Sequence, residues 1–183
     1  MRWPLYPAMY AKNALAVDYE KLRGRRGIEA LIFDIDNTIA PFDVADPPEE
    51  AVNFLLSLKA KGFSVCLLSN NSRARVLRFN KTMRLFAVHR AGKPGSKGVK
   101  RAMRLMRSEP ENTAIIGDQV FTDVLCGNIW GLYTILVRPV SDRDEFTVRL
   151  KRGLESIVLK AYHKRRRRGY GKRTPKLHGN IGR

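Results

Sequence analysis

The sequence lacks the features of secreted and membrane-spanning proteins. It has only two cysteines among its 183 residues, Cys66 in an apolar strand-like run and Cys126 in a helix-like segment. Cysteines in such segments are usually buried free thiols, and a disulfide is the less favoured alternative. No apolar run approaches the roughly 20 residues that a membrane-spanning helix needs, and the N-terminus lacks the apolar core of a secretory signal. We therefore predict a cytoplasmic protein, soluble or bound peripherally at the inner face of the membrane.

Acidic residues are scarce as well, since 17 Asp and Glu stand against 35 Lys and Arg, a formal charge of +18. Such a surface attracts nucleic acid, anionic lipid or phosphorylated substrates, and charge alone does not choose among them. Residues 160–183 contain ten of these bases and no acid. Because so polar a stretch cannot offset the entropy of ordering, we predict a flexible basic tail over 162–183. For the residues before this tail we predict an N-terminal segment over 1–27 and one globular domain over 28–161.

The apolar residues of that domain form short runs separated by segments of helical period. The runs that predict strands are 30–33, 63–68, 87–89, 113–116 and 133–137. Helical periodicity fills the intervals, at 51–58, from Arg73 onward, at 99–106 and again before the last run. Runs that are apolar throughout indicate strands covered on both faces. We predict an α/β fold, a doubly wound parallel sheet of five strands.

Two carboxylates follow the first apolar run, in the pentad Asp34-Ile35-Asp36-Asn37-Thr38. Side chains at i and i+2 of an extended segment project to the same side, so these like charges repel each other. The pair is tolerated if a cation binds between the carboxylates or if one of them holds a proton, and both conditions suit phosphate chemistry. The alternative is that Asp34 and Asp36 merely cap the turn or helix that follows.

Polar residues also follow the next two runs. Ser69-Asn70-Asn71 offers a hydroxyl and backbone amides near a helix start, which suits the binding of phosphate oxygens, although Ser-Asn is also common in turns. Gly92-Lys93-Pro94 places one ammonium near the edge of the sheet, although a lone lysine is more often simply solvated.

Two more aspartates, Asp118 and Asp123, follow the fourth run, one at its end and one after the turn into a helix. Hard oxygen ligands at that place suit Mg²⁺, and a helix cap is the alternative for either residue. Ligands of open α/β sheets bind at the carboxyl ends of the strands, and all four polar groups fall there.

The joint pattern resembles the haloacid dehalogenase superfamily, whose motifs are matched by Asp34-x-Asp36-x-Thr38, Ser69-Asn70, Lys93-Pro94 and Gly117-Asp118-x-x-x-x-Asp123. A narrower likeness, to the phosphatidylglycerophosphatase-related phosphatases of subfamily IIIA, rests on Tyr19-Glu20-Lys21-Leu22, Gly27-Ile28, Asp36-Asn37-Thr38 and Gly117-Asp118-Gln119 with Thr122-Asp123. This family implies a Rossmann-like fold without a cap domain. The basic extension after Ala161 departs from the family pattern.

The resemblance also implies a role for each residue. Asp34 would be the nucleophile that forms an aspartyl-phosphate, and Asp36 would protonate the leaving group and then activate water. Mg²⁺ would be held by Asp34, the backbone carbonyl of Asp36 and Asp118, with Asp123 either at the metal or orienting Lys93. Lys93 would neutralise charge opposite the metal. The phosphate oxygens would be bound by Thr38, Ser69 and Asn70.

The short link between Asp36 and the helix predicted near Glu49 leaves no room for a lid domain. A site without a lid is not closed over a small metabolite, so we expect a substrate that is large or presented on a surface. A lipid head-group phosphate such as phosphatidylglycerophosphate satisfies both conditions and the family resemblance.

The C-terminal part leaves its partner open. A stripe of apolar residues at helical spacing predicts a final helix on the sheet, or alternatively a basic amphipathic helix on anionic membrane. The members of the stripe are Phe146, Leu150, Leu154, Ile157, Val158 and Ala161. A second function class is a nucleic-acid-associated protein whose tail binds RNA or DNA, with a phosphatase site that acts on nucleotide or polynucleotide ends or is vestigial. A tail without a dedicated partner is the third interpretation.

Overall fold

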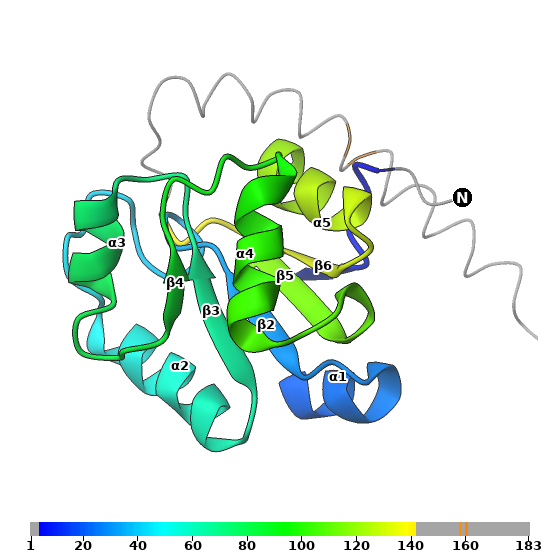
Figure 1. The fold of residues 1–183 in the computed structure, drawn as a ribbon, viewed down its shortest axis with the longest axis horizontal. Helices are drawn as coiled ribbons and strands as arrows, with labels where there is room; N and C mark the ends of the chain where they lie inside the picture. The colour runs from blue at the N-terminus through cyan, green and yellow to red at the C-terminus, as the bar shows by residue number, and fades with distance from the viewer. Residues whose placement is uncertain (1–3, 142–157, 159, 161–183) are drawn as a thin grey trace, which may run out of the picture.

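The computed structural model describes residues 4–141, 158 and 160, and it contains one parallel sheet (Figure 1). Its strands pair in the order β1-β6-β5-β2-β3-β4, and every pair is parallel. The strands are β1 Met9–Ala11, β2 Ala30–Phe33, β3 Ser64–Leu68, β4 Phe86–Val88, β5 Thr113–Gly117 and β6 Tyr133–Val137. The predicted α/β class is confirmed.

The prediction of five strands is wrong by one, because β1 adds a sixth at the edge of the sheet. It lies in the N-terminal segment 1–27 and pairs with β6 in the register Met9↔Ile135 to Ala11↔Val137. An edge strand of three half-buried residues has no continuous apolar run, so periodicity does not reveal it. Residues 9–11 of this N-terminal segment thus belong to the same sheet as the other strands.

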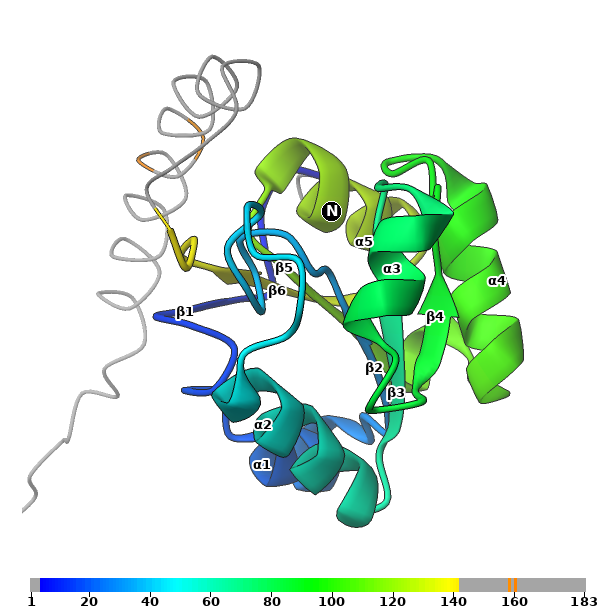
Figure 2. The same ribbon diagram turned by 90° about the vertical axis from the view of Figure 1, so that its left-hand side faces the viewer.

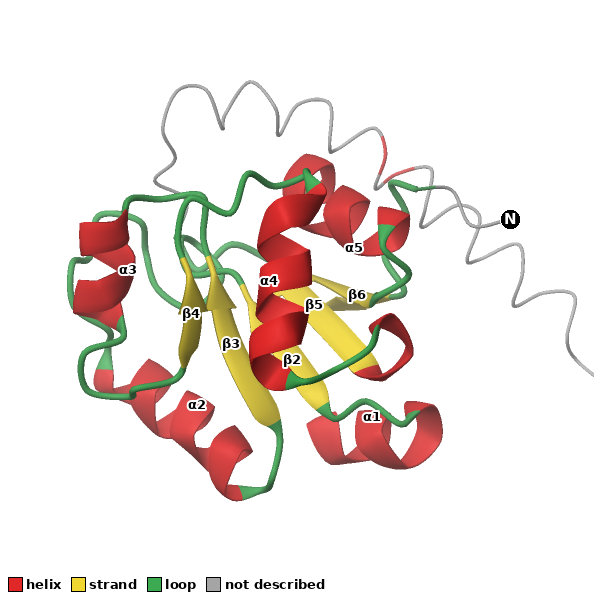
Figure 3. Cartoon of the chain, viewed as in Figure 1, coloured by secondary structure: helices red, strands yellow, loops and turns green. Residues whose placement is uncertain are grey.

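Helices cover both faces of the sheet (Figure 3). They are α1 Tyr19–Arg26, α2 Glu49–Ala60, α3 Arg73–Phe79, α4 Ser96–Met106 and α5 Leu125–Ile129, with a 3₁₀ turn at Pro110–Asn112 and a π-helical turn at Val120–Val124. Helix α1 was not predicted, because only Tyr19 and Leu22 of its eight residues are buried. Its ends are nevertheless defined locally: the Asp18 side chain accepts a hydrogen bond from the Lys21 amide, and Gly27 ends the helix at φ 66.

Alternate residues of the central strands enter different apolar cores. Leu31 and Phe33 of β2 pack with side chains of α1, α2 and α3. Ala30 and Ile32 pack with α4 and with Cys126 of α5. This alternation follows from the two-residue period of a strand, and burial of each large side chain contributes about 1.5–3 kcal/mol. The sheet is therefore sandwiched, as predicted, and its carboxyl edge is left for the loops that carry the polar residues.

No further domain is inserted between β2 and α2 or between β3 and β4 within residues 4–141, which agrees with the predicted absence of a cap. In the same described part of the chain, no helix is long and apolar enough to cross a membrane. Of the predicted apolar stripe, Val158 is described: it packs against a cluster of Val120, Val124 and Leu136. The basic tail predicted over 162–183 lies outside the described residues.

Candidate active site

Four strand ends meet at one edge of the sheet and form a cleft there. The cleft has a volume of about 360 Å³. It is lined by Asp34, Asp36, Asn37, Phe42, Ser69, Asn70, Asn71, Lys93, Gln119 and Thr122. Because β5, β2, β3 and β4 are neighbours in the sheet, the residues after each strand converge although they lie far apart in the sequence.

Lys93 bridges two carboxylates at the base of this cleft. Its Nζ lies 2.7 Å from Asp34 Oδ1 and 2.7 Å from Asp123 Oδ1. The lysine side chain is only 3% exposed, so these ion pairs are shielded from water. Burial by itself lowers the pKa of Lys93, but the carboxylates of Asp123 and Asp34 outweigh it and raise the pKa overall. Lys93 is therefore a fixed cation at the pH of the cell.

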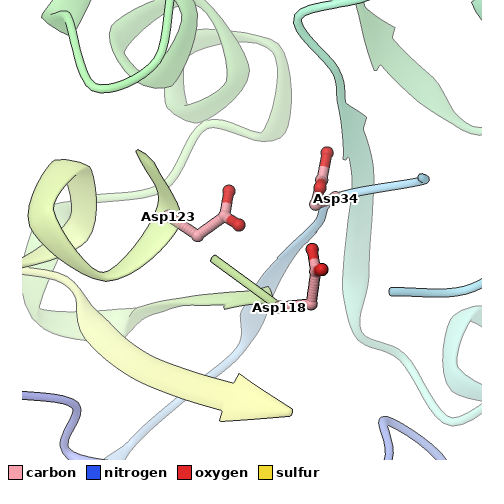
Figure 4. Close-up of side chains that lie close together, drawn as sticks. All are labelled: Asp34, Asp118 and Asp123. Carbon is pink, nitrogen blue, oxygen red and sulfur yellow. The ribbon is translucent and has the colours of Figure 1, made fainter. Parts of the chain in front are cut away.

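Three buried carboxylates, those of Asp34, Asp118 and Asp123, surround a common space (Figure 4). One oxygen from each lies within 4.8 Å of the others. A single ammonium cannot balance the charge of three buried carboxylates. Burial raises the pKa of the Asp34 carboxyl to about 7, although the positive charge of Lys93 opposes this shift. A hard divalent cation with oxygen ligands would remove this imbalance. The donor set therefore fits a divalent metal, which Asp34 and Asp118, at adjacent strand ends, could hold.

Asp123 reaches the cluster from the π-helical turn, and backbone groups hold it there. Its Oδ2 accepts a hydrogen bond of 3.2 Å from the Gln119 amide. A Cβ atom on Gly117 would lie 2.2 Å from the Asp123 carboxyl, so only glycine fits at the end of β5. Asp123 contacts Lys93 and also belongs to the acidic cluster, so the geometry accommodates both roles considered for it.

The Asp36 side chain lies outside this cluster, on the wall of the cleft. Its Oδ1 accepts a hydrogen bond of 3.1 Å from Arg75 Nη2, and its Oδ2 is 3.3 Å from Ser69 Oγ. Arg75 also donates to the backbone carbonyl of Ala45 at 2.7 Å. The Asp36 carboxylate is therefore oriented by two residues of the segment that follows β3, one at the strand end and one in α3.

Two of the residues predicted to bind phosphate are engaged with other site residues. Thr38 Oγ1 donates to Asp118 Oδ1 at 3.2 Å, so it orients a carboxylate of the cluster. The Asn70 side chain accepts from the Lys93 amide at 2.8 Å and donates to the Lys93 carbonyl at 3.1 Å. Ser69 lines the cleft, and its Oγ accepts from the Asn71 amide at 3.0 Å. Asn70 thus holds the backbone that carries Lys93.

Arg75 and Phe42 were not singled out by the sequence analysis. The first turn of α3 contains Arg73 and Arg75 and no acid, which opposes the usual preference for negative charge at a helix start. That inversion is a signal that these cations serve a partner outside the helix, although it does not identify Asp36. Phe42 carries no comparable signal, because it lies in a loop whose path is set by tertiary contacts.

Known proteins resemble this chain in sequence and in fold. Residues 90–147 match a family model described as HAD-hydrolase-like. The probable phosphatase YqeG of Bacillus subtilis is 36% identical over 155 residues, which cover 85% of this chain and 90% of that protein. Phosphatidylglycerophosphate phosphatase 1, chloroplastic/mitochondrial, of Arabidopsis thaliana is 30% identical over 170 residues, and the match covers 85% of this chain and 47% of that protein.

Solved structures share the fold at low sequence identity. The cobalt-bound form of the deoxy-D-mannose-octulosonate 8-phosphate phosphatase from Haemophilus influenzae has a TM-score of 0.52 and 16% identity, covering 76% of this chain and 91% of that chain. A HAD phosphatase from Thermococcus onnurineus has a TM-score of 0.50 and 13% identity, covering 65% of this chain and 90% of that chain. Likenesses at this level of identity establish the arrangement of the sheet and helices.

Proposed function

This chain is a phosphatase of the haloacid dehalogenase superfamily, and from that premise we propose that it hydrolyses a lipid head-group phosphomonoester, with Mg²⁺ as cofactor and Asp34 as nucleophile. The observation that carries the proposal is the position of Asp34 at the base of the cleft. Its carboxylate contacts Lys93 at 2.7 Å and shares a buried space with Asp118 and Asp123. A carboxylate beside a fixed cation and a metal-type donor set is arranged for phosphoryl transfer.

In the first step a carboxylate oxygen of Asp34 attacks phosphorus. A bond from this oxygen to phosphorus forms, while the bond from phosphorus to the leaving alkoxide breaks. Asp36 donates a proton to that alkoxide, which leaves as an alcohol. The Lys93 ammonium offsets negative charge on the phosphoryl oxygens, and Ser69 Oγ is a hydrogen-bond donor for one of them. Mg²⁺ held by Asp34, Asp118 and the Asp36 carbonyl would supply further charge neutralisation and alignment.

In the second step water attacks phosphorus and the bond to Asp34 breaks. Asp36, now unprotonated, takes a proton from the attacking water, so that inorganic phosphate is released and both aspartates return to their initial states. Asp36 suits this exchange because it lines the cleft and is 22% exposed, which lets water reach it. Asp123 and Asn70 act through Lys93, the first on its ammonium and the second on its backbone.

The lipid substrate is supported by two features. No cap domain covers the cleft within the described residues 4–141, so a large head group or a bilayer surface can approach it. The Arabidopsis relative is named for phosphatidylglycerophosphate, and its match covers 85% of this chain. Because the chain spans about half of that relative's length, the substrate stays a proposal here.

Phosphate release by wild-type and Asp34→Asn protein tests both parts of the proposal. We expect Mg²⁺-dependent release from a generic aryl phosphate, and higher kcat/KM for phosphatidylglycerophosphate in mixed micelles than for soluble nucleotides and sugar phosphates. Asp34→Asn should lose at least about a thousandfold in kcat because it removes the nucleophile. Asp46→Asn is the matched control, since Asp46 is an exposed partner of Arg78. Retention of substantial activity by Asp34→Asn would refute the nucleophile, and faster turnover of soluble esters would refute the lipid substrate.

We also propose that the basic C-terminal segment binds anionic membrane, where each cation near the surface contributes on the order of 1 kcal/mol. Sedimentation with anionic vesicles, beside RNA retention at matched salt, tests this in intact protein and in protein lacking residues 162–183. Vesicle binding that depends on the tail is expected. Tail-dependent binding that prefers RNA would contradict the membrane proposal.

A further inference from the structure

A second groove lies behind the loop that carries the catalytic aspartates. It has a volume of about 370 Å³. Its apolar lining includes Leu15, Ile39, Pro48 and Val140, and its charged lining residues are Lys12, Arg138 and Glu50. The groove is formed by the chain after β1 and β6 together with the chain between β2 and α2, and Figure 2 shows these segments on the same side of the molecule. The established phosphatase chemistry does not use it.

The two cations stand beside each other at the carboxyl edge of the sheet. Lys12 and Arg138 each come directly after a strand residue, and those residues, Ala11 and Val137, are register partners of β1 and β6. Neither cation forms an ion pair with another residue among those that the structure describes. Adjacent like charges repel, and an anion bound between them would reverse that repulsion. The edge of the sheet therefore offers a place for a negatively charged group.

One loop separates this groove from the catalytic cleft. Asn37 and Phe42 line the cleft, whereas Thr38, Ile39 and Pro41 line the groove. Thr38 connects the two regions directly, because its Oγ1 donates to Asp118 of the acidic cluster. The Val140 amide also donates to the Asn37 carbonyl at 2.8 Å, which ties the chain after β6 to the same loop. The groove and the cleft therefore lie on the two sides of one loop.

We infer that the groove binds the non-reacting part of a phospholipid substrate, with its phosphodiester between Lys12 and Arg138 and its acyl-glycerol portion along Leu15, Pro48 and Val140. The inference rests on the proposed function and adds to it a place for the phosphodiester of that lipid, outside the cleft in which the phosphomonoester is cleaved. Charge complementarity supports this occupant, since Lys12 and Arg138 together with Glu50 leave the groove one net positive charge, which matches one phosphodiester anion. The exposed apolar residues Leu15 and Val140, 40% and 48% exposed, match hydrocarbon beside it.

A pair of lipids that differ in the phosphodiester tests the inference. Phosphatidylglycerophosphate has both phosphate groups, whereas phosphatidic acid has acyl chains and a phosphomonoester only. The variant is Lys12→Ala/Arg138→Ala, and the control is Lys59→Ala/Arg104→Ala, which removes two exposed cations of α2 and α4. All proteins are assayed on both lipids in the same mixed micelles and on an aryl phosphate.

We expect the groove variant to raise KM for phosphatidylglycerophosphate roughly tenfold or more, because contacts with a charged group are lost. Its kcat, and its KM for phosphatidic acid and the aryl phosphate, should stay within about twofold of wild type. The control variant should behave as wild type on all three substrates.

The outcomes separate this inference from the proposal on which it depends. If wild type hydrolyses phosphatidylglycerophosphate and the groove variant matches it, the groove is not a subsite. Equal losses on both lipids, or equal losses in the control variant, would show general attraction to the micelle and would also overturn the inference. If wild type hydrolyses the aryl phosphate but neither lipid, the lipid substrate itself is wrong and the groove inference falls with it.

Discussion

Arg75 of helix α3 donates a hydrogen bond of 3.1 Å to Asp36, which lies in the loop after β2. The Arg75 side chain is 12% exposed, and its Nη1 donates to the Ala45 carbonyl at 2.7 Å. Arg75 therefore links Asp36, the proposed general acid, to Ala45, which lies in the loop that also contributes Phe42 to the cleft. We regard Arg75 as a positioning residue, because it acts on the substrate through Asp36.

Substitution of Arg75 should affect substrates according to their leaving groups. An alkoxide needs a proton from Asp36, whereas an acidic phenol leaves without one. Arg75→Ala should therefore lower kcat roughly tenfold or more for an alkyl phosphate and less than about threefold for an aryl phosphate with an acidic phenol. Arg75→Lys should restore part of the lost kcat, because a lysine keeps the positive charge but lacks the planar guanidinium that donates to two acceptors at once.

Arg78→Ala is the control for this experiment. Arg78 lies one helical turn further along α3 and pairs with Asp46 at 2.6 Å, but both side chains are more than half exposed. Exposed ion pairs contribute little to stability, so neither substrate should be affected. Equal losses on the alkyl and aryl substrates in Arg75→Ala would show that Arg75 serves the structure of the loop and does not position Asp36.

A methyl group at Gly117 should damage the acidic cluster. The Cβ of Gly117→Ala would lie 2.2 Å from the Asp123 carboxyl, so Asp123 must shift away from Lys93. We expect a loss of about 1–3 kcal/mol in the free energy of unfolding, together with a large fall in kcat. Gly24→Ala is the matched control, because a Cβ there meets nothing within 4 Å and the helix α1 gains from alanine. Urea unfolding and phosphate release measure both effects, and full activity in Gly117→Ala would contradict the role of Asp123.

Removal of divalent metal should abolish activity and also lower the melting temperature. The three carboxylates of the cluster repel one another, and a cation that binds only the folded state stabilises it. EDTA should therefore lower Tm, and added Mg²⁺ should restore both Tm and turnover. Asp118→Asn removes one charge, so in EDTA it should be at least as stable as wild type while its gain from Mg²⁺ is smaller. An identical response of the two proteins to Mg²⁺ would place the metal elsewhere.

The two thiols should be unreactive in the folded protein. Burial raises the pKa of Cys66 to about 12 and that of Cys126 to about 11, so both stay protonated at pH 8 and up to about pH 10. Because the thiolate is the reactive form, Ellman's reagent should label neither residue in native buffer and both in denaturant. Labelling of one equivalent in the native state, rising between pH 7 and pH 9, would show an accessible thiol.

Local patterns were enough to predict most of the sheet. Apolar runs such as 30–33 and 113–116 are strands β2 and β5, because a strand covered on both faces needs apolar residues at every position. The edge strand β1 and helix α1 escaped prediction, since each buries few side chains and has a weak period. Prediction was therefore reliable where burial is high and failed at the margins of the fold.

The candidate site divides in the same way. Asp34, Lys93 and Asp118 stand directly at strand ends, and parallel strands bring such residues to one edge whatever their separation in the chain. Residue type and spacing were therefore sufficient to identify them. The partners of Asp36 and Asn70 were not predictable, because a side-chain hydrogen bond depends on the path of a loop and on the direction of each rotamer.

The sequence of this chain thus specifies its class of fold and its acidic strand ends, because these depend on neighbours a few positions apart. It also specifies the strong positive charge, which follows from composition alone. Three features arise only once the sheet has formed. They are the pairing of Arg75 with Asp36, the hydrogen bonds of Asn70 to the Lys93 backbone, and the groove that contains Lys12 and Arg138. Each of them joins segments tens of residues or more apart, and such contacts are set by packing in three dimensions, which no local period encodes.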